Sequence, residues 1–139
     1  MKVEHHDLSI RTKGRGLYDI TREVAEAVER SRVRDGTCTV FIQHTSASLV
    51  VQENADPSVR RDMERWIEKI APEDPRAYEH DAEGSDDMPS HLRSAITRTS
   101  ETFPIRGGAL GLGTWQGLYV WEHRRSAHSR RVTVTIVGE

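Results

Sequence analysis

The sequence has little of what disulfide-stabilised, membrane-spanning or nucleic-acid-binding proteins require. It contains one cysteine, Cys38, so no disulfide can form within the chain. This cysteine lies in the apolar run 37–42, which indicates a small buried residue rather than a nucleophile. No apolar run approaches the roughly 20 residues of a membrane span, and residues 1–10 lack the apolar segment of a signal peptide. We therefore expect a cytoplasmic protein with no membrane partner.

An excess of charge of one sign is also missing. Lys and Arg total 20 against 22 Asp and Glu, and this balance argues against a dedicated nucleic-acid binder. The charges are nevertheless unevenly distributed. Residues 73–87 hold seven acids and one base, Arg76, whereas residues 123–131 hold four arginines and two histidines. Either an acidic metal-binding loop lies near a basic anion-binding segment, or both segments are solvated surface.

Apolar residues make up 35% of the chain and fall in periodic runs, so its 139 residues can bury one core. We expect a single domain of residues 1–139. A core this thin favours oligomerisation. Alternation and β-branched runs predict strands at 3–12, 37–43, 48–52, 109–113, 115–123 and 131–137. These strands and the helices below predict an α+β fold, a two-layer sandwich with a largely antiparallel sheet.

Three helices are predicted from apolar residues at helical spacing. The first starts near Ile20, and the second starts at Pro57 with Asp56 as its N-cap. The third is short and begins at Pro89 or Ser90. The residues expected on the buried faces of the second and third helices are Val59, Met63, Trp66, Ile67 and Ile70, then Leu92, Ala95 and Ile96. Between these helices, residues 72–89 show no periodicity, and loops of this length are usually functional or disordered.

The segment HDAEGSDDMPSH, residues 80–91, carries the sharpest chemical signal. Its two histidines and several carboxylates lie within twelve residues, interrupted by glycine and ended by proline. Divalent transition metals take neutral imidazole and anionic oxygen ligands that converge from different directions, which a loop can supply. The spacing matches no standard zinc motif such as HExxH. The segment therefore predicts a metal site, with an acidic solvated loop as the alternative.

Three further segments are rich in polar residues that core packing does not need. Residues 43–48 follow a buried strand, so His44, Ser46 and Ser48 either face a pocket or form structural hydrogen bonds. Residues 107–117 fit neither GxGxxG nor a Walker A loop, because Gln116 stands at the last glycine position. That segment is interpreted as a bent strand pair, or as a surface where Thr114 and Gln116 present polar groups.

The last of these segments is residues 122–131. Arginine side chains there suit phosphate or carboxylate recognition, and Glu122 is a candidate metal ligand or general base. Surface charge is the simpler interpretation of Arg125, Arg130 and Arg131.

Three long blocks of this sequence resemble the signature segments of the YjbQ family of small bacterial and archaeal proteins. They are HTSASLVVQENADPSVRRDMERW, EHDAEGSDDMPSHLRSAI and LGTWQGLYVWEHR, and the likeness spans nearly the whole chain. The resemblance implies an α+β sandwich assembled as a homotrimer, with histidines around a metal near subunit boundaries. The metal ligands it implies are His44, His80 and His91.

The resemblance also implies a pocket around that metal. Its expected catalytic residues are Glu83, Asp87 and Glu122, and its expected substrate-binding residues are Ser46, Ser48, Thr114, Gln116 and Arg124. The family is often labelled secondary thiamine-phosphate synthase. That label implies a transferase that joins a pyrimidine diphosphate to a thiazole phosphate and releases pyrophosphate. Arg124 would hold a phosphate oxygen of such a small phosphorylated metabolite.

Three function classes remain open from the sequence. A metal-dependent transferase and a metal-dependent hydrolase of a phosphorylated or cyclic metabolite both need an open coordination position. The hydrolase additionally needs a water held by Glu83, Asp87 or Glu122. A non-catalytic binding module needs no open position. Three imidazoles favour zinc as the divalent ion, and magnesium is the alternative for the transferase reaction.

Overall fold

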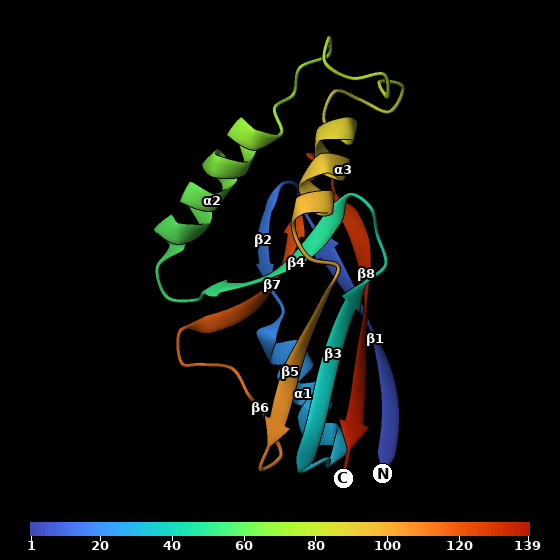
Figure 1. Ribbon diagram of the computed structural model, residues 1–139, viewed down its shortest axis with the longest axis vertical. Helices are drawn as coiled ribbons and strands as arrows, with labels where there is room; N and C mark the ends of the chain where they lie inside the picture. The colour runs from blue at the N-terminus through green and yellow to red at the C-terminus, as the bar shows by residue number, and fades with distance from the viewer.

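The computed structural model describes all residues, 1–139, as eight strands and three helices (Figure 1). The elements in chain order are β1 Lys2–Thr12, β2 Gly16–Asp19, α1 Thr21–Ser31, β3 Asp35–Ile42, β4 Ala47–Glu53, α2 Pro57–Ile70, α3 Asp87–Ile96, β5 Ser100–Arg106, β6 Ala109–Leu110, β7 Gln116–Glu122 and β8 His128–Gly138. No helix combines the length and the apolar character needed to cross a membrane.

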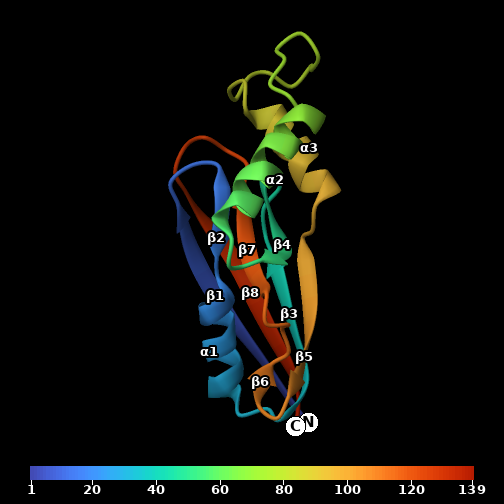
Figure 2. The same cartoon turned by 90° about the vertical axis from the view of Figure 1, so that its left-hand side faces the viewer.

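The strands form two antiparallel sheets. The larger sheet has the order β1-β8-β3-β5-β6, and the smaller has the order β2-β7-β4. Figure 2 shows the smaller sheet lying over one half of the larger sheet, while α1 covers the other half. The α+β class and the largely antiparallel pairing predicted from the sequence are confirmed. What the sequence did not show is that the strands divide between two sheets.

The core lies between the two sheets and beneath α1. It is a cluster of 17 buried residues, to which α1 contributes Val24, Ala27 and Val28. The strands contribute every second residue, such as Val132, Val134 and Ile136 of β8, because successive side chains of a strand point to opposite faces. Cys38 is among the buried residues, in agreement with its expected packing role.

Three strands differ from the prediction. β2 was not predicted. β5 was not predicted, because Pro104 interrupts its alternation and cannot donate to the strand ladder. Its neighbours Phe103 and Ile105 still point into the core. The expected strand 109–113 is reduced to the two residues of β6, because Pro104 accepts a hydrogen bond from the Gly111 amide but has no N–H to return it.

The buried faces of α2 and α3 also differ from expectation. Asp56 caps α2 as predicted, accepting a hydrogen bond from the Ser58 amide at 2.9 Å, but Ile67 is the only fully buried residue of its apolar stripe. α3 begins at Asp87, earlier than predicted, and the expectation that Ala95 and Ile96 face inward is wrong. α3 instead buries a polar face. The cause is Arg93, whose guanidinium turns inward to donate two hydrogen bonds to the carbonyl oxygen of Ala71, at the end of α2.

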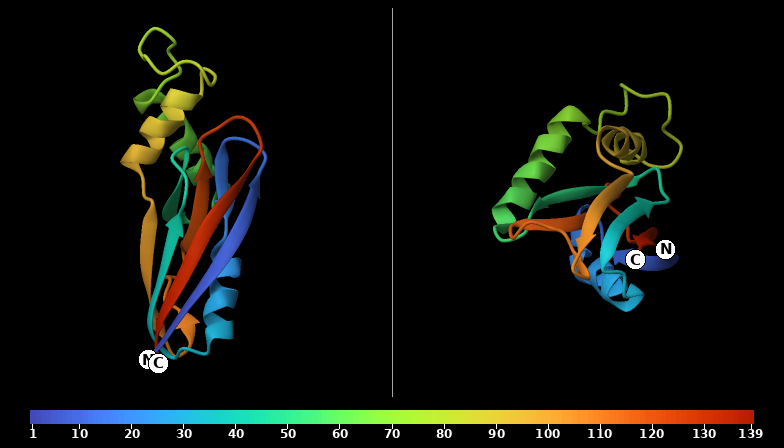
Figure 3. Two further views of the ribbon diagram at one scale, coloured as in Figure 1. Left: turned by 90° about the vertical axis from the view of Figure 1, so that its right-hand side faces the viewer. Right: turned by 60° about the horizontal axis from the view of Figure 1, so that its bottom comes forward.

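The loop between α2 and α3, residues 71–86, projects from one end of the molecule, and both chain termini lie at the opposite end (Figure 3). The connections β1–β2, β3–β4 and β7–β8 reach the same end as this loop (Figure 1). This convergence places three of the polar segments singled out in the sequence, residues 43–48, 80–91 and 122–131, near one another, whereas residues 107–117 lie elsewhere.

Candidate metal centre

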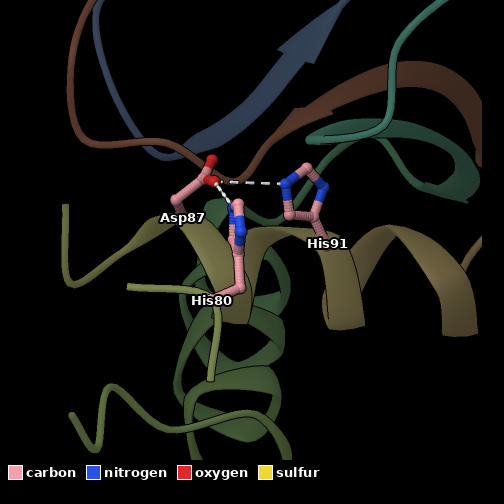
Figure 4. Close-up of side chains that lie close together, drawn as sticks. All are labelled: His80, Asp87 and His91. Atoms are coloured by element: carbon pink, nitrogen blue, oxygen red, sulfur yellow. Dashed lines mark hydrogen bonds and ion pairs between the residues drawn. The ribbon is translucent and has the colours of Figure 1, made fainter. Parts of the chain in front are cut away.

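Three side chains converge where the α2–α3 loop enters α3 (Figure 4). His80 comes from the loop, while Asp87 and His91 lie one turn apart on the same face of α3. The Asp87 Oδ2 atom is 2.5 Å from His80 Nε2 and 3.2 Å from His91 Nε2. One potential ligand atom from each residue lies within 4.8 Å of the other two. This spacing fits three ligands around a single metal ion.

Asp87 is held in place by an arginine from the opposite side. Its side chain is 2% exposed, and Arg124 Nη1 donates to its Oδ1 at 2.5 Å. The same guanidinium donates to Asp86 Oδ2 at 3.1 Å and to the Glu83 carbonyl at 2.9 Å. Burial raises the pKa of Asp87, but the hydrogen bond from His80 and the charge of Arg124 outweigh it and lower the pKa. Oδ2 thus stays an anionic ligand directed at both histidines.

His91 is oriented by the end of a different strand. Its Nδ1 atom lies 2.9 Å from the carbonyl oxygen of Thr45, which can only accept, so Nδ1 carries a proton. In a neutral imidazole, Nε2 then holds a lone pair directed at Asp87 and His80. A histidine fixed through Nδ1 by a backbone carbonyl is the arrangement typical of metal-bound imidazoles.

The donor set therefore fits a divalent ion. Two imidazole nitrogens and one carboxylate oxygen match the ligands of zinc in catalytic sites, which keep a fourth position for water or substrate. Without an ion, the lone pair of neutral His91 would face the anionic Asp87 oxygen, and only a doubly protonated ring would relieve that repulsion. A cation between the three atoms satisfies all of them.

Comparison with known proteins agrees with the fold and the chain length. The family model described as UPF0047 protein YjbQ-like matches residues 6–139. The chain belongs to the YjbQ family. Among its relatives, UPF0047 protein sll1880 of Synechocystis is 52% identical over 95% of this chain and 90% of its own length. The YjbQ protein of Escherichia coli O157:H7 is 44% identical over 95% of this chain and 96% of its own length.

Solved structures of YjbQ relatives share the whole fold. A YbjQ-like protein of unknown function from Sulfolobus solfataricus aligns with a TM-score of 0.87 and 27% identity, covering 99% of this chain and 100% of that one. A YjbQ/UPF0047 family protein from Clostridium acetobutylicum aligns with a TM-score of 0.83 and 35% identity, covering 96% of this chain and 99% of that one. The family is of unknown function, so membership shows the fold and no specific activity.

His44, the third expected metal ligand, lies apart from His80 and His91 within this chain. Its Nε2 accepts a hydrogen bond from the Arg131 amide at 2.8 Å, and its Nδ1 is 3.3 Å from Arg130 Nη1. Burial and the charge of Arg130 lower the pKa of His44, which favours a neutral ring. Its role as a ligand therefore stays a prediction from the resemblance.

Glu122 belongs to a second polar cluster beside the metal centre. Its side chain is fully buried and ion-paired with Arg130, and it accepts from Thr12 Oγ1 at 2.6 Å and from the Arg124 amide at 3.1 Å. Burial raises its pKa, but Arg130 and Thr12 outweigh that effect and lower it. An anionic, fully bonded Glu122 is suited to holding Arg124 in position rather than to accepting a proton from a substrate.

The remaining expected residues are spread over three places. Glu83 is at the rim of the metal centre, where its Oε2 lies 4.0 Å from His80 Nε2 and its side chain is 67% exposed. Ser46 Oγ accepts from Arg130, and Ser48 Oγ pairs with His123 Nε2. The third place, that of Thr114 and Gln116, is the far end of β7. It lies about 20 Å along the strand from Glu122.

Two contributors to the site were not identified from the sequence. Asp86 accepts from both Arg124 and the Arg125 amide, at 3.1 Å and 2.9 Å. Thr45 contributes through its backbone carbonyl, which no side-chain pattern reveals. The adjacent acidic pair Asp86-Asp87 at a helix start is the sequence feature that could have identified Asp86.

Proposed function

We propose that the chain is a metal-dependent enzyme whose divalent ion, zinc in the first instance, is held by His80, Asp87 and His91. The observation that carries this proposal is the convergence of two Nε2 atoms on one buried carboxylate oxygen. The backbone bond to His91 Nδ1 and the arginine on Asp87 supply the outer contacts that orient metal ligands in proteins. An acidic solvated loop would not need a carboxylate that is 2% exposed.

Three protein ligands favour a catalytic role over a closed structural site. A bound zinc ion with an open fourth position polarises phosphoryl oxygens and lowers the pKa of bound water. Arg124 keeps Asp87 in its ligand orientation, and Glu122 holds the Arg124 backbone. Glu83 is exposed near His80, where its carboxylate can accept a proton from a water molecule.

The substrate we propose is a small phosphorylated metabolite. Thiamine-phosphate synthesis, which the family resemblance implies, is the first reaction to assay, because both of its substrates carry phosphate groups. Hydrolysis of a phosphate ester is the second candidate, and the exposed Glu83 favours it, because a hydrolase needs a general base near the metal-bound water.

Metal content tests the proposal directly. We expect about one zinc ion per chain by elemental mass spectrometry of the untagged protein, and its loss in His91→Ala. His5→Ala is the matched control, since His5 is exposed on β1 and bonds only Thr135. No metal in the wild type, even after reconstitution with zinc, manganese or magnesium, would overturn the proposal and favour a binding module.

We also propose that the functional assembly is a homotrimer, as the family resemblance implies. Large apolar side chains on several surfaces support self-association, among them Trp66 at 52% and Ile96 at 54% exposure. Native mass spectrometry should show three chains per particle. A monomer at micromolar concentration would refute the trimer and would leave the proposal of the metal centre unaffected.

A further inference from the structure

A cavity lies outside the metal centre, between the first half of α2 and the start of β2. It has a volume of 420 Å³ and contains no residue of the metal centre. Its walls carry four arginines, Arg15, Arg60, Arg61 and Arg65, against a single carboxylate, Glu64. Such a volume lies within the usual range for pockets that take small molecules.

Two of the four arginines of this cavity, Arg60 and Arg61, are poorly compensated by negative charge. Neither Arg60 nor Arg61 forms an ion pair with a carboxylate. Arg15, by contrast, pairs with Glu68 at 3.3 Å and with Glu73 at 3.4 Å. Arg65 pairs with Asp62, but that pair is about 70% exposed on both sides and therefore weak. The cavity thus concentrates positive charge that an external anion can neutralise.

Arg60 is also fixed in position by a neutral partner. Its Nη1 donates to the Tyr119 hydroxyl at 3.2 Å, and its guanidinium carbon lies 5.5 Å from the centre of the Tyr119 ring. Tyr119 is itself buried and donates to the Glu53 carbonyl at 3.1 Å. The arginine is therefore ordered before any ligand arrives, and its charge is not cancelled. Pre-ordering of this kind lowers the entropy cost of binding.

The one carboxylate of the cavity is already engaged. Glu64 accepts a hydrogen bond from the Trp121 indole at 2.5 Å, and burial raises its pKa. Glu64 therefore competes only weakly with an external anion for the arginines. Leu17 and Pro57 add a short apolar wall beside the guanidinium groups.

We propose that this cavity binds the phosphate or diphosphate group of a small molecule through Arg60 and Arg61, with Arg15 and Arg65 at its margins. Planar guanidinium forks match phosphate oxygens and bind them through paired hydrogen bonds. Arg15 also lines a neighbouring cavity together with Arg125, whose amide bonds Asp86. The anion site thus borders a cavity that Arg125 lines, but it contains no residue of the metal centre.

Isothermal titration calorimetry of the full chain tests this proposal. The protein is first stripped of metal with EDTA and dialysed, and then titrated with pyrophosphate at low salt. We expect one saturable site per chain, with affinity at least 10-fold lower in Arg61→Gln and in Arg60→Gln. The matched control is Arg98→Gln, since Arg98 is 74% exposed and lies outside the cavity. This control should bind like the wild type. Circular dichroism checks that each variant is folded.

Further arms identify the ligand and separate this site from the metal centre. Inorganic phosphate and glycerol phosphate are titrated in parallel, and tighter binding of glycerol phosphate would assign the site to a phosphate ester rather than to the free ion. His91→Ala should retain pyrophosphate binding, so a failed metal centre leaves this result standing. The proposal is overturned if no saturable binding occurs, if Arg60→Gln and Arg61→Gln bind like Arg98→Gln, or if His91→Ala abolishes binding.

Discussion

Removing Arg124 tests whether the metal centre depends on a carboxylate held from outside. Its side chain is 17% exposed and makes charge-assisted hydrogen bonds to Asp86 and Asp87, whose side chains are 10% and 2% exposed. Arg124→Met leaves two buried carboxylates without their cation. Breaking a buried pair from one side costs about 3–5 kcal/mol, and partial solvent contact places this case near the lower end. We therefore expect a loss of about 3 kcal/mol in the metal-free protein, seen as a lower midpoint of urea unfolding.

The same substitution should also weaken metal binding. Loss of an outer partner of a metal ligand typically costs 10–100-fold in affinity, because the ligand is no longer oriented. A 10-fold weaker zinc affinity removes about a further 1.4 kcal/mol of stability at a fixed excess of zinc. Competition with a fluorescent chelator measures the affinity. Arg124→Lys serves as the control for charge, since it keeps the cation but not the three-way fork. Its zinc affinity should be as low as that of Arg124→Met. Unchanged or tighter zinc binding in both variants would refute the view that Arg124 orients Asp87.

Two further predictions concern the buried polar groups beside the site. Glu122→Gln should cost about 3 kcal/mol in urea unfolding, since Arg130, 4% exposed, loses its carboxylate; a loss under 1 kcal/mol would contradict a tight buried pair. Burial lowers the pKa of His123 to about 3 from 6.5, so between these values the unfolded state binds more protons and stability falls as pH decreases. Its contribution from pH 7 to pH 5 is a loss of about 2 kcal/mol. His123→Gln should flatten that part of the pH profile, and an unchanged slope would refute the assignment.

Features that depend only on neighbouring residues could be predicted from the sequence. The start of α2 follows from Asp56-Pro57, because the carboxylate caps the helix and proline fits its first turn. The pairing of His80 with His91 was predicted because both lie in one short segment rich in carboxylates. The inward face of α3 could not be predicted, because it depends on a bond between Arg93 and the carbonyl of Ala71 that joins two helices.

The rest of the site could not be predicted, because it depends on how strands distant in sequence pair with one another. Glu122 looked like a base at a strand end, but the pairing of β1 with β8 brings Thr12 and Arg130 onto it. Thr114 and Glu122 are close in sequence, yet an extended strand separates them along most of its length. Polar residues that are close in sequence on one strand therefore cannot be assumed to line the same pocket.

The metal ligands come from one short segment, but connections between other elements hold them in place. The β3–β4 connection supplies the Thr45 carbonyl to His91, and the β7–β8 connection supplies Arg124 to Asp87. Glu122 then ties Arg124 to Arg130 at the start of β8. Both sheets thus brace α3 from the same end of the molecule. Because these contacts hold the ligands through backbone and buried groups, the centre should keep its geometry when the ion is removed. A metal-free His80–Asp87–His91 cluster is therefore expected to bind zinc without refolding, with nearly identical circular dichroism before and after. A large gain of structure on zinc binding would show instead that the ion assembles the site.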